Sequence, residues 1–432
     1  MPKKLFFLHI PKTAGTTFNA FLEQQYSYDE IIPRRFFGKN VLYVTAEDIK
    51  EHQKDLAGIS LFRGHYGYEI CRQFVDTFTT VTVLRDPLRR VVSLYNDWRT
   101  KSEENLETAP DLEKSLAFLA KEKSFEDFIR TDHPLIPRLF YDAQAKMLAS
   151  TFRCELDRAE LHHAALENLN TFDYVGITEA FEVFLSSLCV HMGWHYPRVI
   201  EPLNTARHHL KAQDLDADTI AFVKDKNAVD YALYEHAKTL SLKTANLALR
   251  QPAPAEEFLD LRSQGTPEIT MAMPTPGIGW HVREGEPDAL WRWTGPGKQS
   301  SIFVAIAPRP YTVQIYVVSI VKREILDDCT ILFNGIPLPK TIQRLSIRKR
   351  FLITVELPKA YINPDQASEF MIQVPFTASH ADLDPQNRDR RQKGIAIRNI
   401  IFVPQEDDTT PVSSSSRAGW QFWRRSSPAI RP

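Results

Sequence analysis

The chain has 432 residues, of which 43% are hydrophobic and 25% are charged. This composition is ordinary for globular proteins and excludes wholesale disorder, and the length suggests two or three domains at roughly 150 residues each. The 53 Lys and Arg residues balance 54 Asp and Glu residues. Binding of nucleic acid or another polyanion through net charge is therefore excluded, whereas a local basic cleft is not.

Four cysteines, Cys71, Cys154, Cys189 and Cys329, lie far apart and form no metal-ligand spacing. We therefore expect reduced thiols, no disulfide framework and no bound metal. The sequence contains no run of about 18 apolar residues, so we expect no membrane span. The apolar stretch at residues 5–10 is too short for a secretory signal, and from these negative observations we expect a cytoplasmic protein.

Residues 1–250 alternate between short apolar segments and helical patterns. Strands are expected at 5–10, 41–44 and 60–62 and, most clearly, at the β-branched run 79–84. Helices are expected over 15–25, 87–99, 111–121, 124–131, 137–150, 158–169, 179–193, 216–225 and 227–246. Buried strands separated by helices predict an α/β fold with a parallel sheet flanked by helices on both faces.

The pattern changes after residue 250. A Pro-rich linker is expected over 251–277. It is followed over 278–404 by short segments rich in Val, Ile, Thr and aromatic residues, with an Asn334-Gly335 turn, which predict a mostly antiparallel β-sandwich. The Ser-, Arg- and Pro-containing tail over 405–432 is expected to be disordered.

The first motif that carries chemistry, HIPKTAGTTF at residues 9–18, lies between the first strand and the first helix. Small residues let the backbone approach an anion, and a helix N-terminus presents N–H groups and a partial positive charge. This is the chemistry of a phosphate cradle, formed by Lys12, Thr13, Ala14, Gly15, Thr16 and Thr17. It is not a Walker A loop, because the lysine precedes the glycine. Taken alone, an ordinary strand–helix turn fits it about as well.

The second motif reads VLRDPLRRVVSLY at residues 83–95. Arg85 follows a predicted strand, and ligands gather at the carboxyl ends of parallel strands. Ser93 lies about two turns into the following helix, so an arginine fork and a hydroxyl group could hold a second phosphate. The alternative is that Arg85 pairs with Asp86 or a surface carboxylate and that Ser93 is a neutral helix residue.

Together, the two motifs resemble those of the sulfotransferase family. In that family the first motif binds the 5′-phosphosulfate and the second binds the 3′-phosphate of 3′-phosphoadenosine 5′-phosphosulfate, PAPS, whose product is 3′-phosphoadenosine 5′-phosphate, PAP. The segment FRGHY at 62–66 resembles the Gly-His segment of the heparan/uronyl 2-O-sulfotransferase branch. Segments 141–149, 174–179 and 204–207 are also similar to that branch. The resemblance covers about residues 1–245 and implies a P-loop-like sulfotransferase fold.

The resemblance implies transfer of a sulfuryl group from PAPS to a hydroxyl of a carbohydrate or glycan acceptor, without a metal. Lys12 would neutralise the bridging oxygen, and His65 would be the catalytic base. Arg207, in the basic closing segment, joins the cradle, Arg85 and Ser93 as an expected donor-binding residue. His208 and His209 stay open as alternative bases, and His65 could instead be a structural histidine.

Two other classes of function stay open. A kinase-like phosphoryl transferase would use the same cradle, although the sequence has no Walker ending and no evident pair of Mg²⁺-binding carboxylates. A non-catalytic glycan-binding protein with a vestigial transferase domain would use the sandwich. The aromatic residues there could stack on sugars or fill the core: Trp280, Trp291, Trp293 and Tyr311. The sandwich could also support a homo-oligomer.

Overall fold

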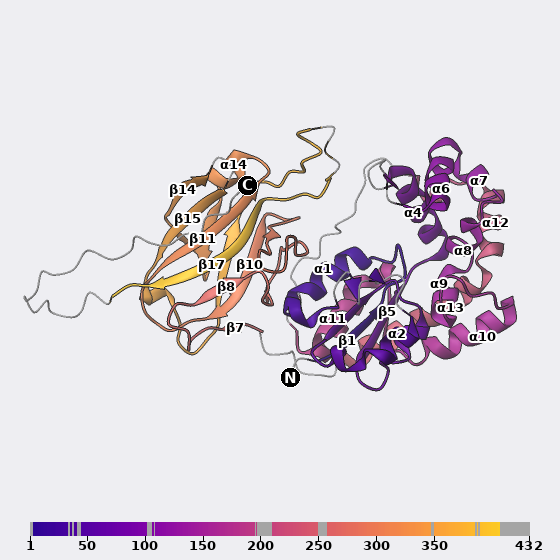
Figure 1. Ribbon diagram of the computed structural model, residues 1–432, viewed down its shortest axis with the longest axis horizontal. Coiled ribbons are helices and arrows are strands. Elements are labelled where there is room, and N and C mark those ends of the chain that lie inside the picture. Colours follow the sequence, from indigo (N-terminus) through magenta and orange to yellow (C-terminus); the bar gives the residue numbers. More distant parts are fainter. Residues whose placement is uncertain are drawn as a thin grey trace, which may run out of the picture.

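The computed structural model describes residues 3–32, 35–36, 39–40, 45–101, 106–107, 109–194, 196, 210–248, 257–346, 350–384, 387 and 389–406. Figure 1 shows an α/β part formed by the first half of the chain and an all-β part formed by the second. The expected strand at 41–44 and the closing segment 204–207 lie outside the described residues.

A four-stranded parallel sheet organises the N-terminal part. Its strands are β1 (Leu5–Leu8), β4 (Leu61–Gly64), β5 (Thr79–Leu84) and β6 (Tyr174–Ile177). They lie in the order β4-β1-β5-β6, and β1 pairs in parallel with both β4 and β5. Every residue of β1 is buried, as a continuous apolar run predicts for a strand covered on both faces. A separate two-stranded sheet consists of β2 (Arg35–Phe36) and β3 (Lys39–Asn40).

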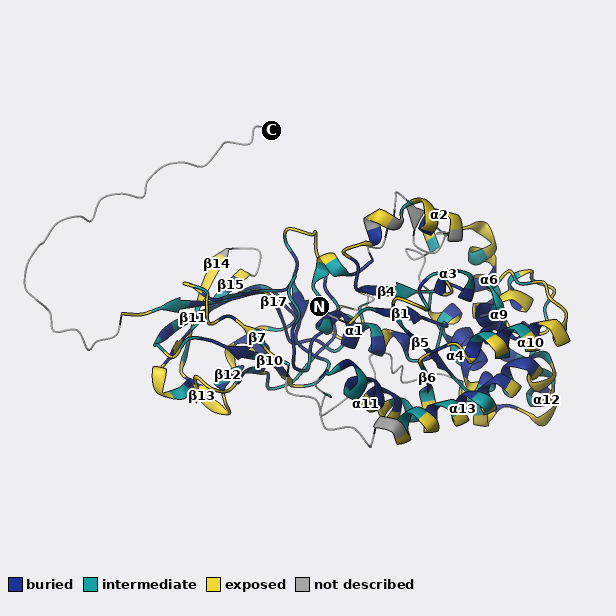
Figure 2. Ribbon diagram, turned by 90° about the horizontal axis from the view of Figure 1, so that it is seen from below, coloured by how far each residue is buried: buried dark blue, intermediate teal, exposed yellow. Residues whose placement is uncertain are grey.

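Helices cover both faces of the parallel sheet (Figure 2). The helices of this part are α1 (Gly15–Gln25), α2 (Ala46–Glu51), α3 (Tyr68–Cys71), α4 (Pro87–Thr100), α6 (Asp111–Glu122), α7 (Phe125–Phe128), α8 (Leu135–Leu139), α9 (Ala143–Ala149), α10 (Arg158–Leu169), α11 (Phe181–Met192), α12 (Ala217–Lys226) and α13 (Ala228–Ala248). Of these, α6, α7, α8 and α12 pack with α4 in a hydrophobic cluster of their own. Leu5 and Phe7 of β1 pack with α1 and α11. Phe6 and Leu8 point to the other face, where α3, α9, α10 and α13 pack. The period-two alternation of a strand thus divides β1 between two cores, and the predicted α/β fold is confirmed.

The single helix expected over 137–150 is wrong, because two helices, α8 and α9, occupy this region. Asp142, between them, has a left-handed φ of 45° that ends regular α-helical geometry. Its backbone N–H donates to Asn227 Oδ1 over 3.0 Å, which holds the break in place. The consequence for function is that α9 starts as a separate helix beside Arg85.

The C-terminal part consists of two packed sheets. The first has the order β13-β12-β16-β10-β7 and the second the order β14-β15-β11-β17-β8, with β9 beside β17. The strands are β7 (Leu259–Asp260), β8 (Glu268–Thr270), β9 (Arg292–Trp293), β10 (Gln299–Ala305), β11 (Tyr311–Ile320), β12 (Thr330–Phe333), β13 (Ile336–Leu338), β14 (Lys340–Ser346), β15 (Arg350–Leu357), β16 (Ser368–Gln373) and β17 (Ile395–Pro404), with the short helix α14 (Arg323–Asp327) after β11. Most pairings are antiparallel, and β7 pairs in parallel with β10. The predicted, mostly antiparallel sandwich is therefore confirmed.

Aromatic residues of the sandwich serve mainly in its core. Trp280, Trp293 and Tyr311 are 3%, 4% and 0% exposed and belong to one hydrophobic cluster, whereas Trp291 is half-buried against it. The expected turn between β12 and β13 has Asn334 at φ 50° and Gly335 at φ 77°, the left-handed geometry of a tight hairpin. For the three buried side chains, core packing rather than sugar stacking is the correct alternative.

Candidate functional site

A cleft of about 1030 Å³ lies at the carboxyl ends of the parallel strands. Its walls include segments that follow each of the four strands: 9–17 after β1, 65–70 after β4, Arg85 after β5 and Thr178 after β6. This is the edge at which open parallel sheets bind ligands, because loops from neighbouring strands meet there. The structure therefore brings both sequence motifs into one site.

The loop between β1 and α1 has the geometry of an anion cradle. Lys12 and Ala14 both have left-handed backbones, with φ of 71° and 66°. Ala14 is the N-cap of α1, and alanine carries no side-chain oxygen that could compete with a ligand for the helix N-terminus. The Thr13 hydroxyl is fully buried and donates to Ile10 O over 2.8 Å, so it braces the loop from within. Thr16 and Thr17 line the cleft beside Gly15.

The Lys12 ammonium group is held by a carboxylate that sequence reasoning missed. Lys12 Nζ donates to Asp97 Oδ1 over 2.8 Å, and the two side chains are 21% and 44% exposed. Asp97 lies on α4 four residues after Ser93, and both side chains line the cleft. Residues at this spacing share one face of a helix, so the position of Ser93 was a signal that could have identified Asp97.

Arg85 joins the second motif to the first. Its Nη1 donates to Lys12 O over 3.0 Å. The buried Gln144 side chain clamps the Arg85 backbone from the other side, because Gln144 Oε1 accepts from Arg85 N and Gln144 Nε2 donates to Arg85 O, each over 3.0 Å. The Asp230 carboxylate accepts from the backbone N–H groups of Gln144 and Ala145 over 3.2 and 2.7 Å and so secures the start of α9. Among the described residues, Arg85 forms no ion pair with Asp86 or another carboxylate, and its guanidinium group instead contacts Lys12 O.

Two arginines at the cleft have guanidinium nitrogens without an acceptor among the residues that the structure describes. Arg85 Nε and Arg90 Nε and Nη1 are buried and have no hydrogen-bond partner among the described residues. Burial lowers the pKa of Arg90 to about 10, which leaves it a cation at neutral pH. Buried polar atoms are nearly always satisfied in proteins, so orphaned cationic donors are the condition expected of a site that an anion completes. The residues present therefore fit an anionic ligand such as a phosphate group.

His65 has the tautomer required of a base. Its Nδ1 lies 2.7 Å from His9 O, and a carbonyl oxygen can only accept, so Nδ1 carries the proton in the neutral ring. Nε2 is then left with a free lone pair. Burial lowers the pKa of His65 below 6.5, the hydrogen bond to His9 O opposes that shift, and the charge of Lys12 adds to it. The ring is therefore neutral, and able to accept a proton, at neutral pH.

His9 supports His65 through its backbone and its ring. The two imidazole centroids are 4.2 Å apart, and His9 also stacks on Phe7 at 5.1 Å. The His9 side chain is 9% exposed, and burial followed by the charge of His65 holds its pKa well below the ordinary value. The close approach of α1 leaves no room for a larger residue at Gly15, where an added Cβ would lie 1.7 Å from His9 Nε2. His9 is therefore a packed support rather than a second exposed base.

The remaining wall of the cleft is rich in cations. Lys101, Arg138 and Arg153 line it together with Trp98, and Lys101 Nζ lies 3.3 Å from the centroid of the Trp98 ring. A polar ligand could contact these side chains while it faces Lys12 and His65 across the same cleft.

Arg207, His208 and His209 lie outside the described residues, so their expected roles remain predictions. Within the described ranges, no group of three or more His, Cys, Asp or Glu side chains is arranged to hold a metal ion. In the same part of the chain, no helix combines the length and the apolar character needed to cross a membrane.

Comparison with known proteins identifies the N-terminal part. Residues 2–237 match the family described as the sulfotransferase family. No curated protein matches the chain. Among solved structures, a β-glucosidase from Paenibacillus barengoltzii is similar at 10% identity over 81% of this chain and 41% of that one, with a TM-score of 0.15. The chain thus spans less than half the length of that structure, and a similarity of this size supports no conclusion about fold or function.

Proposed function

We propose that this chain, which belongs to the sulfotransferase family, moves a sulfuryl group from PAPS to a hydroxyl of a carbohydrate acceptor. The observation that carries the proposal is the convergence on one cleft of the phosphate loop at Lys12, the second cationic grip at Arg85 and the neutral imidazole of His65.

The two grips suit a donor that is phosphorylated at both ends. The N-terminus of α1 and the Lys12 side chain would hold the 5′-phosphosulfate, while Arg85 and Ser93 would hold the 3′-phosphate. When bound, PAPS supplies an activated sulfuryl group on a phosphate leaving group. Lys12 is paired with Asp97 in the structure, so binding of the donor would redirect its ammonium group from that carboxylate to the phosphate.

The residues of the cleft can perform an in-line transfer by analogy with phosphoryl transfer. His65 Nε2 would accept the proton of the acceptor hydroxyl as its oxygen forms the new bond to sulfur. Lys12 would neutralise the negative charge that develops on the phosphate oxygen when its bond to sulfur breaks. The cations Lys101, Arg138 and Arg153 offer contacts for a polar acceptor.

Calorimetric titration with PAP tests the donor assignment, with ATP and AMP as controls. Tight binding of PAP, weak binding of AMP and loss of PAP binding in Arg85→Ala would support a site for two separate phosphate groups. No PAP binding by the wild-type protein would overturn the proposal, and preference for ATP would favour phosphoryl transfer.

Transfer from PAPS to a panel of glycans then separates an enzyme from a glycan-binding protein. His65→Ala should abolish product formation while PAP affinity stays within about twofold, because the imidazole acts on the acceptor proton. Near-normal turnover in His65→Ala would show that another group is the base.

A further inference from the structure

The C-terminal end of helix α1 is capped by the sandwich. Helix α1 has no basic residue in its last turn, and the last carbonyls of a helix lack intrahelical partners. Three hydrogen-bond donors from the sandwich side bind carbonyl groups at this end of α1. Arg292 Nη2 donates to Glu23 O (2.6 Å) and Thr275 N donates to Gln24 O (2.8 Å), both in the last turn. Arg283 Nη2 donates to the carbonyl oxygen of the C-cap residue Tyr26 (2.7 Å). The end of the phosphate-binding helix is thus completed by another domain.

The capping arginines are buried and are compensated mainly by carbonyl oxygens. Arg292 is 0% and Arg283 is 8% exposed. Burial lowers the pKa of Arg283 to about 10 and also holds the pKa of Arg292 well below its usual value. A buried cation is costly unless it is paired and hydrogen-bonded, and the C-terminal end of a helix provides partial negative charge for this purpose. The C-terminal end of α1 therefore stabilises the two buried cations, and the arginines in turn supply hydrogen-bond donors to the last carbonyl groups of α1.

Glu23 extends the contact to the strand that precedes the proposed base. Its Oε2 accepts from Arg283 N over 2.9 Å, and its Oε1 pairs with Arg63 Nη2. Arg63 belongs to β4, two residues before His65. The Glu23 carboxylate is buried, so the sandwich, α1 and β4 meet at a single carboxylate shielded from water.

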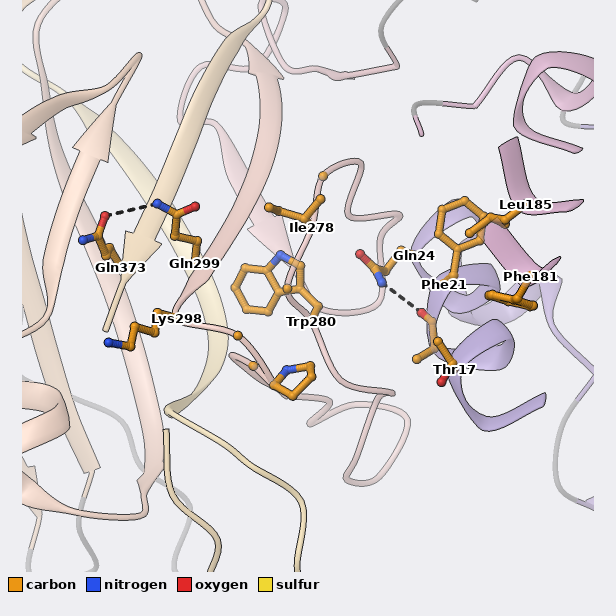
Figure 3. A pocket seen from close by; sticks show the side chains of 16 residues that line it. Thr17, Phe21, Gln24, Phe181, Leu185, Ile278, Trp280, Lys298, Gln299 and Gln373 are labelled. Carbon is orange, nitrogen blue, oxygen red and sulfur yellow. Dashed lines mark hydrogen bonds between the residues drawn. The ribbon is translucent and has the colours of Figure 1, made fainter. Parts of the chain in front are cut away.

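Helix α1 is also the wall between the catalytic cleft and an interdomain pocket. This pocket, of about 320 Å³, is lined on one side by Thr17, Phe21 and Gln24 of α1 and on the other by Ile278 and Trp280 of the sandwich (Figure 3). Thr17 lines the cleft as well. A movement of α1 relative to the sandwich would therefore also displace residues that face the proposed donor site.

We propose that the sandwich completes the donor site, with Arg292 and Arg283 as positioning residues that act through α1 and Glu23. This inference rests on the proposed function insofar as the donor is PAPS. The sandwich fixes one end of an eleven-residue helix, which spans about 16 Å at 1.5 Å per residue. The opposite end of that helix carries the anion cradle, so a rigid helix transmits its placement from Arg292 to Lys12.

Variants of the full-length protein test this proposal. Arg292→Met keeps a long, unbranched side chain but removes the charge and the hydrogen-bond donors. Arg292→Lys keeps the charge and is the alternative test variant if Arg292→Met does not fold. The matched control is Arg323→Met, which removes an exposed sandwich arginine paired with Asp327. We expect about tenfold weaker PAP binding in Arg292→Met, as for a typical coupling between distant sites, an intermediate loss in Arg292→Lys and no change in the control.

Hydrogen exchange without any ligand provides the second readout. Residues 9–25 should exchange faster in Arg292→Met than in wild type, including the loop before α1, at temperatures where melting curves show both proteins folded. A folded variant with wild-type PAP affinity and wild-type exchange over 9–17 would overturn the inference. If the wild-type protein binds no PAP, the donor assignment fails, while the exchange comparison still decides whether the sandwich positions the loop.

Discussion

The Arg85 guanidinium donates from Nη1 to the carbonyl oxygen of Lys12 over 3.0 Å, so the two anion-binding motifs form one hydrogen-bonded unit. Lys12 has a φ of 71°, a conformation that costs a non-glycine residue about 1–3 kcal/mol and persists only when its surroundings hold it. Arg85 supplies part of that support and is itself held by Gln144. Under the proposed function, the contact of Arg85 with one end of the donor would therefore be coupled to the contact of the Lys12 loop with the other.

Arg85→Lys should weaken PAP binding about 10- to 100-fold, since a hydrogen bond to a charged group contributes about 1.5–3 kcal/mol. Lysine keeps the charge but cannot reach both a phosphate and Lys12 O with a planar fork. Calorimetry measures the change, and Arg89→Lys, at an exposed position on α4, the helix that follows Arg85, is the control. Unchanged affinity in Arg85→Lys would mean that the guanidinium does not contact the donor.

Lys12→Ala should lower kcat by about 100- to 1000-fold, the effect of removing a group that stabilises transition-state charge. PAP affinity should fall less, because the backbone of the cradle remains. Steady-state kinetics with an acceptor that the enzyme sulfates separates the two effects. Lys121→Ala, at an exposed position on α6, controls for a general loss of positive charge. A fall in PAP affinity as large as the fall in kcat would assign Lys12 to ground-state binding.

Asp97→Asn should tighten PAP binding severalfold, because it releases Lys12 from a partly exposed ion pair of a kind that is worth roughly 0.2–1 kcal/mol. It should also move the pH profile. The Asp97 charge raises the pKa of His65, so its removal lowers that pKa, and kcat/KM should persist to more acidic pH than in wild type.

The wild-type profile should itself fall only below the ordinary histidine pKa of about 6.5, because burial holds the pKa of His65 down. The measurement is kcat/KM over a range of about three pH units around that value. If the acid limb of the kcat/KM profile shifted to higher pH in Asp97→Asn, the electrostatic assignment would be contradicted.

Gln144→Leu should reduce both stability and donor affinity. The substitution leaves the part-buried N–H and C=O of Arg85 without their partners, at a cost of up to about 1–3 kcal/mol for each unsatisfied group. Chemical denaturation and PAP titration measure the two effects, and Gln213→Leu, at an exposed position, is the control. Lower stability with wild-type PAP affinity would show that Gln144 supports the fold but not the position of Arg85.

Gly15→Ala should impair turnover through His9. The added methyl group would lie 1.7 Å from His9 Nε2, so the imidazole must move, and the carbonyl group of the same residue holds His65. We expect at least a tenfold loss of kcat, consistent with the sensitivity of catalysis to displacements of about 1 Å. Gly58→Ala, where an added Cβ meets nothing within 4 Å, should behave as wild type.

Part of the site was predictable because its residues are adjacent in the sequence. The cradle around Lys12, the β-branched strand 79–84 and the helix after it are encoded by local patterns of small, branched and capping residues. The break at Asp142 was missed because it depends on Asn227, which is remote in the sequence. His65 was found through a family resemblance, whereas its tautomer follows only from its contact with His9 O.

The sequence by itself determined the order of strands and helices, the two anion-binding motifs and the change to an all-β domain, because side-chain periodicity and turn chemistry act over a few residues. Tertiary structure decided which distant groups meet. Lys12 and Asp97 are 85 residues apart, and Glu23 and Arg292 are 269 residues apart. Their contacts arise only when helices and sheets pack, since the burial of apolar faces brings charged groups together that no local pattern relates.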